Sequence, residues 1–379
     1  MRSIRRLPAV AFLIAVSVFT ACSGGGNPCE IPEGKANENG VSVGVAFDIG
    51  GIGDKSFNDA AKRGFDQAVD DGLVSEATCI EPNESGSNRD ENLLALADDG
   101  FDLVFGIGFA FSPAVNENAG NYADQEFAVI DGYATCPPDV CADIPNPAPP
   151  NVTDLTFKEE EGSFLVGVAA AMGAKNESGA QGGRCDTVGF LGGQIGFLIG
   201  KFEAGYTAGV HAVDPEMEVL VEYIGDSTAA FNDAAAGEQL STAMYDDGAC
   251  IIYHAAGASG AGLFTAAVRA DKIAIGVDSD QYQLVSAEQK PHVLTSMLKR
   301  VDTAVYDAIE GVNEGTLEGG TAKVFGIAQG GISYSNSNPF LMTEQIINAV
   351  ENYKSRILDG SVTPPFCIVK PEMPWCEEA

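Results

Sequence analysis

A repeated alternation of short apolar runs with amphipathic stretches constrains this chain more than any other feature. The first series has apolar runs at 41–47, 77–82, 103–107 and 126–131, and helix-like stretches at 57–70, 90–99 and 112–122. The second has apolar runs at 187–191, 217–223, 250–255 and 272–277, and helix-like stretches at 158–172, 196–213, 234–246 and 260–269. This alternation predicts two α/β halves, each with a parallel sheet covered by helices on both faces.

The remaining segments indicate that each half is completed by chain from beyond residue 280. A short apolar run at 294–296 and helix-like stretches at 301–312 and 340–358 are expected to cross back. We therefore expect a first lobe at 41–157, completed by about 281–325, and a second at 158–280, completed by about 326–379. The proline-rich stretch 135–151 is predicted to be a surface connection between the halves.

The N-terminus is typical of an export signal. Arg2, Arg5 and Arg6 precede an apolar stretch at 9–18, so residues 1–21 are predicted to be a signal peptide. A transmembrane anchor is the alternative, but an apolar stretch of about ten residues is short for a span. Residues 18–22 resemble a bacterial lipobox, in which Cys22 would be lipidated after cleavage, and 22–40 would form a flexible tether.

Eight cysteines besides Cys22 remain for disulfide bonds, an even number in a chain predicted to be exported. Sequence alone cannot choose among the pairings. Local position suggests Cys29 with Cys79, Cys136 with Cys141, Cys185 with Cys250, and Cys367 with Cys376. A metal cluster is the weaker alternative, because there is no C-x-x-C pair and the chain has three histidines. We expect no metal site.

The charge balance excludes one class of partner. The chain has 54 acidic and 21 basic residues and a formal net charge of −33. Nucleic-acid binding and adhesion to anionic lipid both need clustered Lys and Arg. Cleavage after residue 21 would remove three arginines and no acid, so the acidity belongs to the mature protein.

The common catalytic motifs are absent. The glycine-rich stretch 50–53 is not followed by the Gly-Lys-Ser/Thr of a phosphate-binding loop and lacks the spacing of a dinucleotide fingerprint, and there is no G-x-S-x-G. His211, His254 and His292 have no neighbouring nucleophile, and His254 lies in an apolar run, typical of a core residue. We expect neither an enzyme nor a cofactor.

Acidic residues end three of the apolar runs. Asp48, Asp131 and Asp278 follow predicted strands in both halves. Any one of them could cap a following helix. Ligands of parallel sheets bind beyond the carboxyl ends of strands, so three such acids predict a shared cleft.

Six blocks of the chain carry a family resemblance, which runs in unbroken order from about 41 to 360. The blocks are residues 46–58, 127–132, 157–167, 201–206, 275–281 and 295–301. They resemble the basic membrane protein family, the type I solute-binding lipoproteins of ABC importers that include the purine nucleoside receptor A group. The resemblance implies a type I periplasmic-binding-protein fold, with two doubly wound lobes joined by a hinge.

The resemblance also implies a set of ligand-binding residues. Phe57 and Phe231 would clamp a purine base, with Phe197 as the alternative to Phe231; ordinary core packing is the alternative for any single Phe. The polar members would be Asp131 at the base edge, Asp48, Asp278 and Lys299 at the sugar, and Asn58 and Gly257 as neighbours. Asp54, Lys55 and Asp280 could instead cap or orient their turns.

The function implied is capture of a purine nucleoside for an ABC permease and ATPase. The protein would be a monomer, lipid-anchored at the cell membrane and facing the periplasm or the exterior. The alternatives are another planar solute such as riboflavin, a sensor or surface lipoprotein without transport, and, more remotely, a nucleoside hydrolase.

Overall fold

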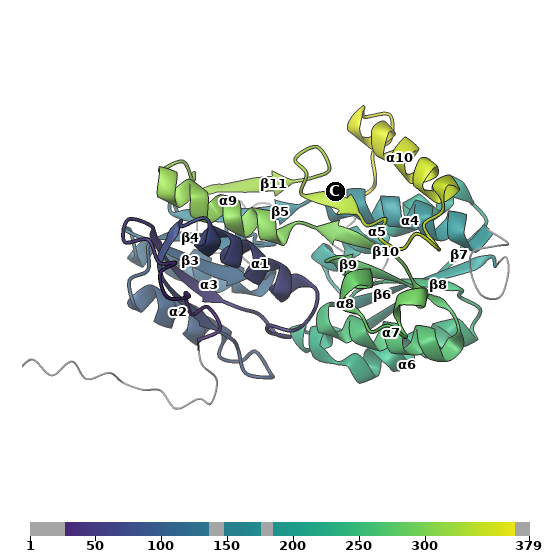
Figure 1. Cartoon of the computed structure of the whole chain (residues 1–379), viewed down its shortest axis with the longest axis horizontal. Helices are drawn as coiled ribbons and strands as arrows, with labels where there is room; N and C mark the ends of the chain where they lie inside the picture. Colours follow the sequence, from purple (N-terminus) through teal and green to yellow (C-terminus); the bar gives the residue numbers. More distant parts are fainter. Residues whose placement is uncertain (1–26, 136–147, 176–184, 368–379) are drawn as a thin grey trace, which may run out of the picture.

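The computed structural model describes residues 27–135, 148–175 and 185–367. They form two lobes side by side, each built around a six-stranded sheet with helices on its faces (Figure 1). Cys22 and the signal and tether residues up to 26 lie outside the described ranges, as do Cys136, Cys141 and Cys376.

The first sheet has the strand order β11-β5-β4-β3-β1-β2, and all its paired strands are parallel. Its strands are β1 (Val41–Ala46), β2 (Val74–Ile80), β3 (Leu103–Ile107), β4 (Glu126–Ile130), β5 (Val152–Phe157) and β11 (Thr321–Phe325). The helices of this lobe are α1 (Phe57–Asp70), α2 (Arg89–Asp98), α3 (Ser112–Asn118) and α9 (Val301–Glu314). Helix α9 returns from the second lobe to pack against α1 (Figure 1).

The second sheet has the order β12-β10-β9-β8-β6-β7, with only the β10–β12 pair antiparallel among the described strands. Its strands are β6 (Thr187–Gln194), β7 (Glu218–Gly225), β8 (Ile251–Ala255), β9 (Ile273–Asp278), β10 (Val293–Lys299) and β12 (Ile332–Tyr334). The helices are α4 (Glu159–Lys175), α5 (Phe197–Val213), α6 (Ala234–Asp246), α7 (Ala261–Ala270), the short α8 (Gln281–Leu284) and α10 (Glu344–Leu358).

Two expectations about the division of the chain were wrong. Strand β10 pairs with β9 and β12, so Val293–Lys299 belongs to the second sheet and not to the first. The proline-rich stretch 135–151 joins β4 to β5, which are neighbours in the first sheet, so it does not connect the lobes. The hydrophobic pattern did not reveal β5, and without β5 that stretch seemed to end the first half.

Within the described residues the chain passes between the lobes at three points: from β5 to α4, from β10 to α9, and from β11 to β12. Backbone hydrogen bonds tie these crossings together. The amide of Lys158 donates to the carbonyl of Phe325 at 3.0 Å, and that of Arg300 donates to Gly331 at 2.8 Å. The crossings form the hinge region, and Lys299 is the last residue before one of them.

Helix α4 is the central helix of the second lobe, because nearly all of its residues are buried against β10, α5 and α10. Glycines permit its close contact with α5. A Cβ on Gly167 would clash with the carbonyl of Tyr206, and one on Gly209 would clash with that of Phe164. This close packing holds the first turn of α4, at Glu160, against Gly205 in the middle of α5.

Two predicted disulfides are confirmed. Cys29 is bonded to Cys79, with their Cα atoms 5.4 Å apart, and Cys185 to Cys250, with Cα atoms 6.4 Å apart. The first ties Cys29, within the predicted tether 22–40, to β2, so the described part of that segment is attached to the first lobe and the expectation of a flexible tether was wrong there. The second joins the segment before β6 to the residue before β8. In the described ranges, no helix combines the length and the apolar character that a membrane span requires.

Candidate functional site

A cavity lies between the lobes. It is lined by residues from both lobes: Asp48, Ile49, Asp54, Phe57, Asn58, Gly108, Phe109, Asp131, Leu198, Ile199, Phe202, Phe231, Ala255, Gly257, Val277, Asp278 and Lys299. All eight residues predicted from the resemblance are among them. The structure therefore brings the predicted set together, and their contact with a ligand stays a prediction.

Asp131 and Asp278 occupy equivalent places in the two lobes. Asp131 follows β4 and Asp278 ends β9, and each of these strands is third in the order of its sheet. Both residues have left-handed backbone conformations, with φ of 58° and 62°. Such values are uncommon outside glycine, although Asp tolerates them better than most residues. The two turns aim two carboxylates into the cavity from opposite lobes.

Lys299 is a buried cation surrounded by acids. Its side chain is 1% exposed, and its Nζ lies 2.6 Å from Oδ1 of Asp131 and 2.9 Å from Oε1 of Glu159. Glu159, at the start of α4, is fully buried and also pairs with Lys201 of α5. A buried charge is costly unless it is paired, so these residues stabilise one another. They join the cavity to the hinge region.

Aromatic rings surround the same ammonium group. The Nζ of Lys299 lies 5.4 Å from the ring centroid of Phe57, 4.9 Å from that of Phe157, and 5.5 Å from that of Phe202. These distances are within the range of cation–π interactions. The cation therefore helps to hold Phe57, the first predicted stacking ring, in the cavity wall.

Burial governs the ionisation of the acids that line the cavity. It raises the pKa of Asp278 to about 7 and the pKa of Asp131 to about 6, although Lys299 opposes both shifts. Burial also acts to raise the pKa of Glu159, but Lys201 and Lys299 outweigh it and hold that pKa below its ordinary value. The same acids raise the pKa of Lys299 against the effect of its own burial. Lys299 is therefore charged.

Phe231, rather than the alternative Phe197, lies at the cavity. The ring of Phe231 is 6.4 Å from that of Phe109, in an edge-to-face arrangement that spans the two lobes. Phe197 is 50% exposed and contacts Phe366 instead. Phe57 and Phe231 thus line the cavity from opposite lobes, as an aromatic clamp requires.

Polar contacts join the lobes directly beside the cavity. The hydroxyl of Ser56, in the first lobe, donates to Oδ2 of Asp278 at 2.5 Å. Ser279 donates to the carbonyl of Ser56 at 3.1 Å and accepts from Arg63 at 3.0 Å. The side chain of Gln281 donates to the carbonyl of Lys55 at 3.2 Å. The structure is therefore a closed arrangement of the lobes.

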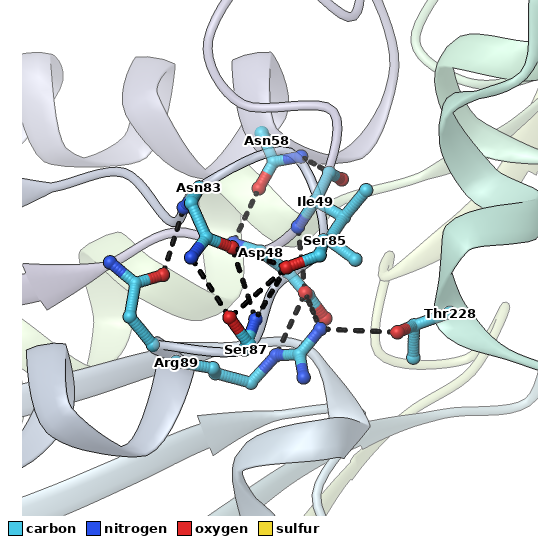
Figure 2. Close-up of polar contacts among 9 residues, drawn as sticks. Asp48, Ile49, Asn58, Asn83, Ser85, Ser87, Arg89 and Thr228 are labelled. Carbon is cyan, nitrogen blue, oxygen red and sulfur yellow. Dashed lines mark hydrogen bonds and ion pairs between the residues drawn. The ribbon is translucent and has the colours of Figure 1, made fainter.

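Asp48 and Asn58 line the cavity close to each other in the first lobe. The backbone amide of Asp48 donates to Oδ1 of Asn58 at 3.2 Å, and Asp48 also forms an ion pair with Arg89 (Figure 2). Asp54 accepts from the amides of Ser56 and Asn58, so its predicted role in orienting its turn is confirmed.

The histidines have structural partners. His254 is fully buried in β8, as predicted, with its Nε2 2.9 Å from Oε1 of Gln281, and burial lowers its pKa to about 4. His211 and His292 contact the backbone carbonyls of Met217 and Lys272. Over the ranges that the structure describes, no group of three or more His, Cys, Asp or Glu side chains is arranged to hold a metal ion.

The charged and aromatic residues at or behind the cavity that were not predicted include Arg89, Phe109, Glu159 and Phe202. Glu159 begins a run of three acids, which is typical of an exposed helix start. Phe109 does follow a predicted strand end, at Gly108, and that position was a signal that could have found it. Arg89 and Phe202 come close only through tertiary packing.

Comparisons with known proteins agree with this geometry. Residues 41–364 match the family model Bmp, described as "ABC transporter substrate-binding protein PnrA-like". A CD4+ T-cell-stimulating antigen of Listeria monocytogenes is 31% identical over 94% of this chain and 97% of its own length. The ABC transporter nucleoside-binding protein BmpA of Lactococcus lactis is 30% identical over 95% of this chain and 99% of its own length.

A solved structure supports the fold assignment. An ABC transporter solute-binding protein from Aeropyrum pernix superposes with a TM-score of 0.71 at 28% identity, covering 86% of this chain and 94% of that one. The predicted type I periplasmic-binding-protein fold is thereby confirmed. The chain belongs to the Bmp family of PnrA-like substrate-binding proteins of ABC transporters, which bind small molecules and are not enzymes.

Proposed function

We propose that this protein captures a purine nucleoside between its lobes and delivers it to an ABC permease. One observation carries the proposal: a cavity between the lobes is lined by aromatic rings from both lobes, three largely buried carboxylates and one buried cation. Stacking on an aromatic ring contributes about 1–3 kcal/mol per base and suits any planar heterocycle. The Lactococcus lactis relative, named as a nucleoside-binding protein, supports the same assignment.

The polar groups suit the rest of a nucleoside. An ionised carboxylate is only an acceptor, so Asp131 can accept from N–H groups of a base, and Asp48 and Asp278 can accept from sugar hydroxyls. Lys299 donates and offsets the charge of these acids. The acids would repel a phosphate group, so we expect nucleotides to bind more weakly than nucleosides.

Calorimetric titration tests the proposal. The purified protein is titrated with guanosine, adenosine, inosine, guanosine 5′-monophosphate and riboflavin. Saturable binding of at least one purine nucleoside, tighter than that of the nucleotide, is expected. Tight riboflavin binding with no nucleoside heat would refute the proposal in favour of another planar solute.

Variants at the cavity locate the binding site. Phe57→Ala and Asp131→Ala should each weaken nucleoside binding at least tenfold, which is about 1.4 kcal/mol. Unchanged affinity in both variants would contradict the assigned site. Release of free base from inosine would instead revive the nucleoside-hydrolase alternative.

We also propose that Cys22 anchors the mature protein to the membrane through lipid. An uncharacterized lipoprotein of Pyrococcus abyssi is 30% identical over 88% of this chain, and its printed name supports this proposal. Mass spectrometry of the mature N-terminus should find acylated Cys22, and Cys22→Ala should release the protein from membranes. Cleavage at another residue, or no added lipid mass, would contradict the proposed lipid anchor.

We also propose that the protein is a monomer. Size-exclusion chromatography should give the mass of a monomer.

A further inference from the structure

The two carboxylate oxygens of Asp48 have different surroundings. Oδ1 accepts from the amide of Ile49 at 2.6 Å, and from Nε and Nη2 of Arg89 at 2.9 and 2.5 Å (Figure 2). None of the described residues donates a hydrogen bond to Oδ2. A Cβ placed on Gly108, another cavity residue, would lie 2.7 Å from Oδ2. Oδ2 therefore faces the backbone of Gly108, which also lines the cavity.

Arg89 directly follows a polar loop. It is the first residue of α2, and the loop 83–88 before it is closed by side-chain hydrogen bonds (Figure 2). Asn83 donates to the hydroxyl of Ser87 at 2.9 Å, and its own amide oxygen accepts from Ser85 at 2.9 Å. The guanidinium also lies 5.7 Å from the ring centroid of Phe111. Arg89 is therefore directed at Asp48 from behind the cavity wall.

The pair is largely buried, with the side chain of Arg89 12% exposed and that of Asp48 13% exposed. Arg89 is not among the cavity residues, so it reaches a ligand only through Asp48. Burial raises the pKa of Asp48, and Arg89 opposes this by attraction and hydrogen bonding. Without Arg89 the carboxylate would lose both its compensating charge and the contacts that orient it.

We propose that Arg89 is a positioning residue that determines specificity: by occupying Oδ1 of Asp48, it presents Oδ2 to one sugar hydroxyl of the ligand. The cavity would therefore discriminate against nucleosides that lack this hydroxyl. A polar group left without its partner in a buried site is costly, so such sites reject analogues that lack the matching group. This inference rests on the proposed function and extends it to a residue outside the cavity wall.

The matched control is Thr228, in the second lobe. Nη2 of Arg89 also donates to Oγ1 of Thr228, at 3.4 Å, a long contact that joins the lobes (Figure 2). Thr228→Val removes this contact and leaves the ion pair with Asp48 intact. It should therefore alter the affinity for all ligands by the same small factor.

The test is a calorimetric panel on the full-length mature protein. Guanosine, adenosine and their 2′-deoxy, 3′-deoxy and 5′-deoxy forms are titrated into wild type, Arg89→Met, Arg89→Lys and Thr228→Val. Wild type should bind one deoxy form at least tenfold more weakly than its parent. Arg89→Met should weaken binding of the parent about tenfold and leave that deoxy form unchanged, so that discrimination disappears. Arg89→Lys should discriminate against the deoxy form more than Arg89→Met does and less than wild type does. Thr228→Val should discriminate as strongly as wild type.

Two further measurements keep the test decisive. Asp48→Asn should cause the same loss as Arg89→Met, and the double variant should lose no more than either, because both act on one contact. Thermal melting of Arg89→Met establishes that the variant is folded. An equal loss of affinity for every ligand, or unchanged discrimination in folded Arg89→Met, would overturn the inference alone. Absence of nucleoside binding by wild type would overturn the proposed function as well.

Discussion

Replacing Lys299 by Met is the most informative perturbation of this protein. Its side chain is 1% exposed, and its ammonium group contacts two acids, Asp131 at 2.6 Å and Glu159 at 2.9 Å. Methionine fills a similar volume with apolar atoms and removes the charge. The two acids then remain buried, and Glu159 retains Lys201 as a partner while Asp131 loses its hydrogen-bonded cation.

The magnitude follows from the burial of these groups. Removing one partner of a buried ion pair costs about 3–5 kcal/mol, because an uncompensated charge is left behind. For lobes of this size, 1 kcal/mol corresponds to roughly 2–4 °C in the melting temperature. We therefore expect Lys299→Met to lower the free energy of unfolding by about 3–5 kcal/mol and the melting temperature by roughly 6–20 °C.

Calorimetric melting and urea unfolding of the ligand-free protein measure this cost. Lys323→Met is the matched control, because Lys323 also pairs with an acid, Asp307 at 2.9 Å, but both side chains are substantially exposed. Exposed pairs contribute about 0–1 kcal/mol. Adding Asp131→Asn to Lys299→Met should recover part of the lost stability by removing the uncompensated acid.

Similar losses in Lys299→Met and Lys323→Met would refute the reasoning. So would a double variant less stable than Lys299→Met, because the cost would then not come from the unpaired carboxylate of Asp131.

Three other predictions concern stacking, ionisation and covalent structure. Phe231→Ala should weaken nucleoside binding roughly 5- to 150-fold by calorimetry, whereas Phe197→Ala, at an exposed ring outside the cavity, should change it less than about twofold. Because burial raises the pKa of Asp278 to about 7, the native protein binds more protons than the unfolded chain below that pH. The melting temperature should therefore fall as pH rises from about 5 to 8, and Asp278→Asn should flatten this slope. Removing the Cys29–Cys79 bond by substituting both cysteines with alanine should cost about 2–4 kcal/mol in urea unfolding.

Specific outcomes would contradict each of these. Equal effects of the two phenylalanine substitutions would place the second ring outside the binding site. If the melting temperature of Asp278→Asn falls with pH as steeply as that of wild type, other groups govern the pH dependence of stability. Two free thiols by mass spectrometry in non-reduced wild type would show that Cys29 and Cys79 are unpaired.

Regular elements were predictable where the hydrophobic pattern was continuous. The predicted bounds of helix 57–70 and strand 103–107 are those of α1 and β3. Strands β5 and β11 were missed for local reasons. In β5 the charged Asp154 interrupts the apolar residues, and in β11 four of five residues are exposed. Such strands form because a neighbouring strand offers partners for their backbone hydrogen bonds. The pattern of their own side chains therefore gives little indication of a strand.

The acids of the cavity were predictable because parallel strands bring their carboxyl ends to one edge of a sheet. Asp48, Asp131 and Asp278 each end an apolar run, and all three line the cavity. Their partners were not predictable in the same way. Arg89 begins a polar helix and Glu159 begins a run of acids, and both patterns are typical of exposed surface.

The amino-acid sequence was enough to predict the two-lobed α/β architecture and the positions of the strand-end acids, and it suggested two cysteine pairs that the structure confirms. These features depend on local periodicity and on the order of elements along the chain. The packing of elements far apart in the chain was needed to show which acids are compensated and which oxygen of Asp48 accepts from Arg89. A charge can be buried only when a partner from another element reaches it, and in this protein those partners are tens to hundreds of residues away along the chain.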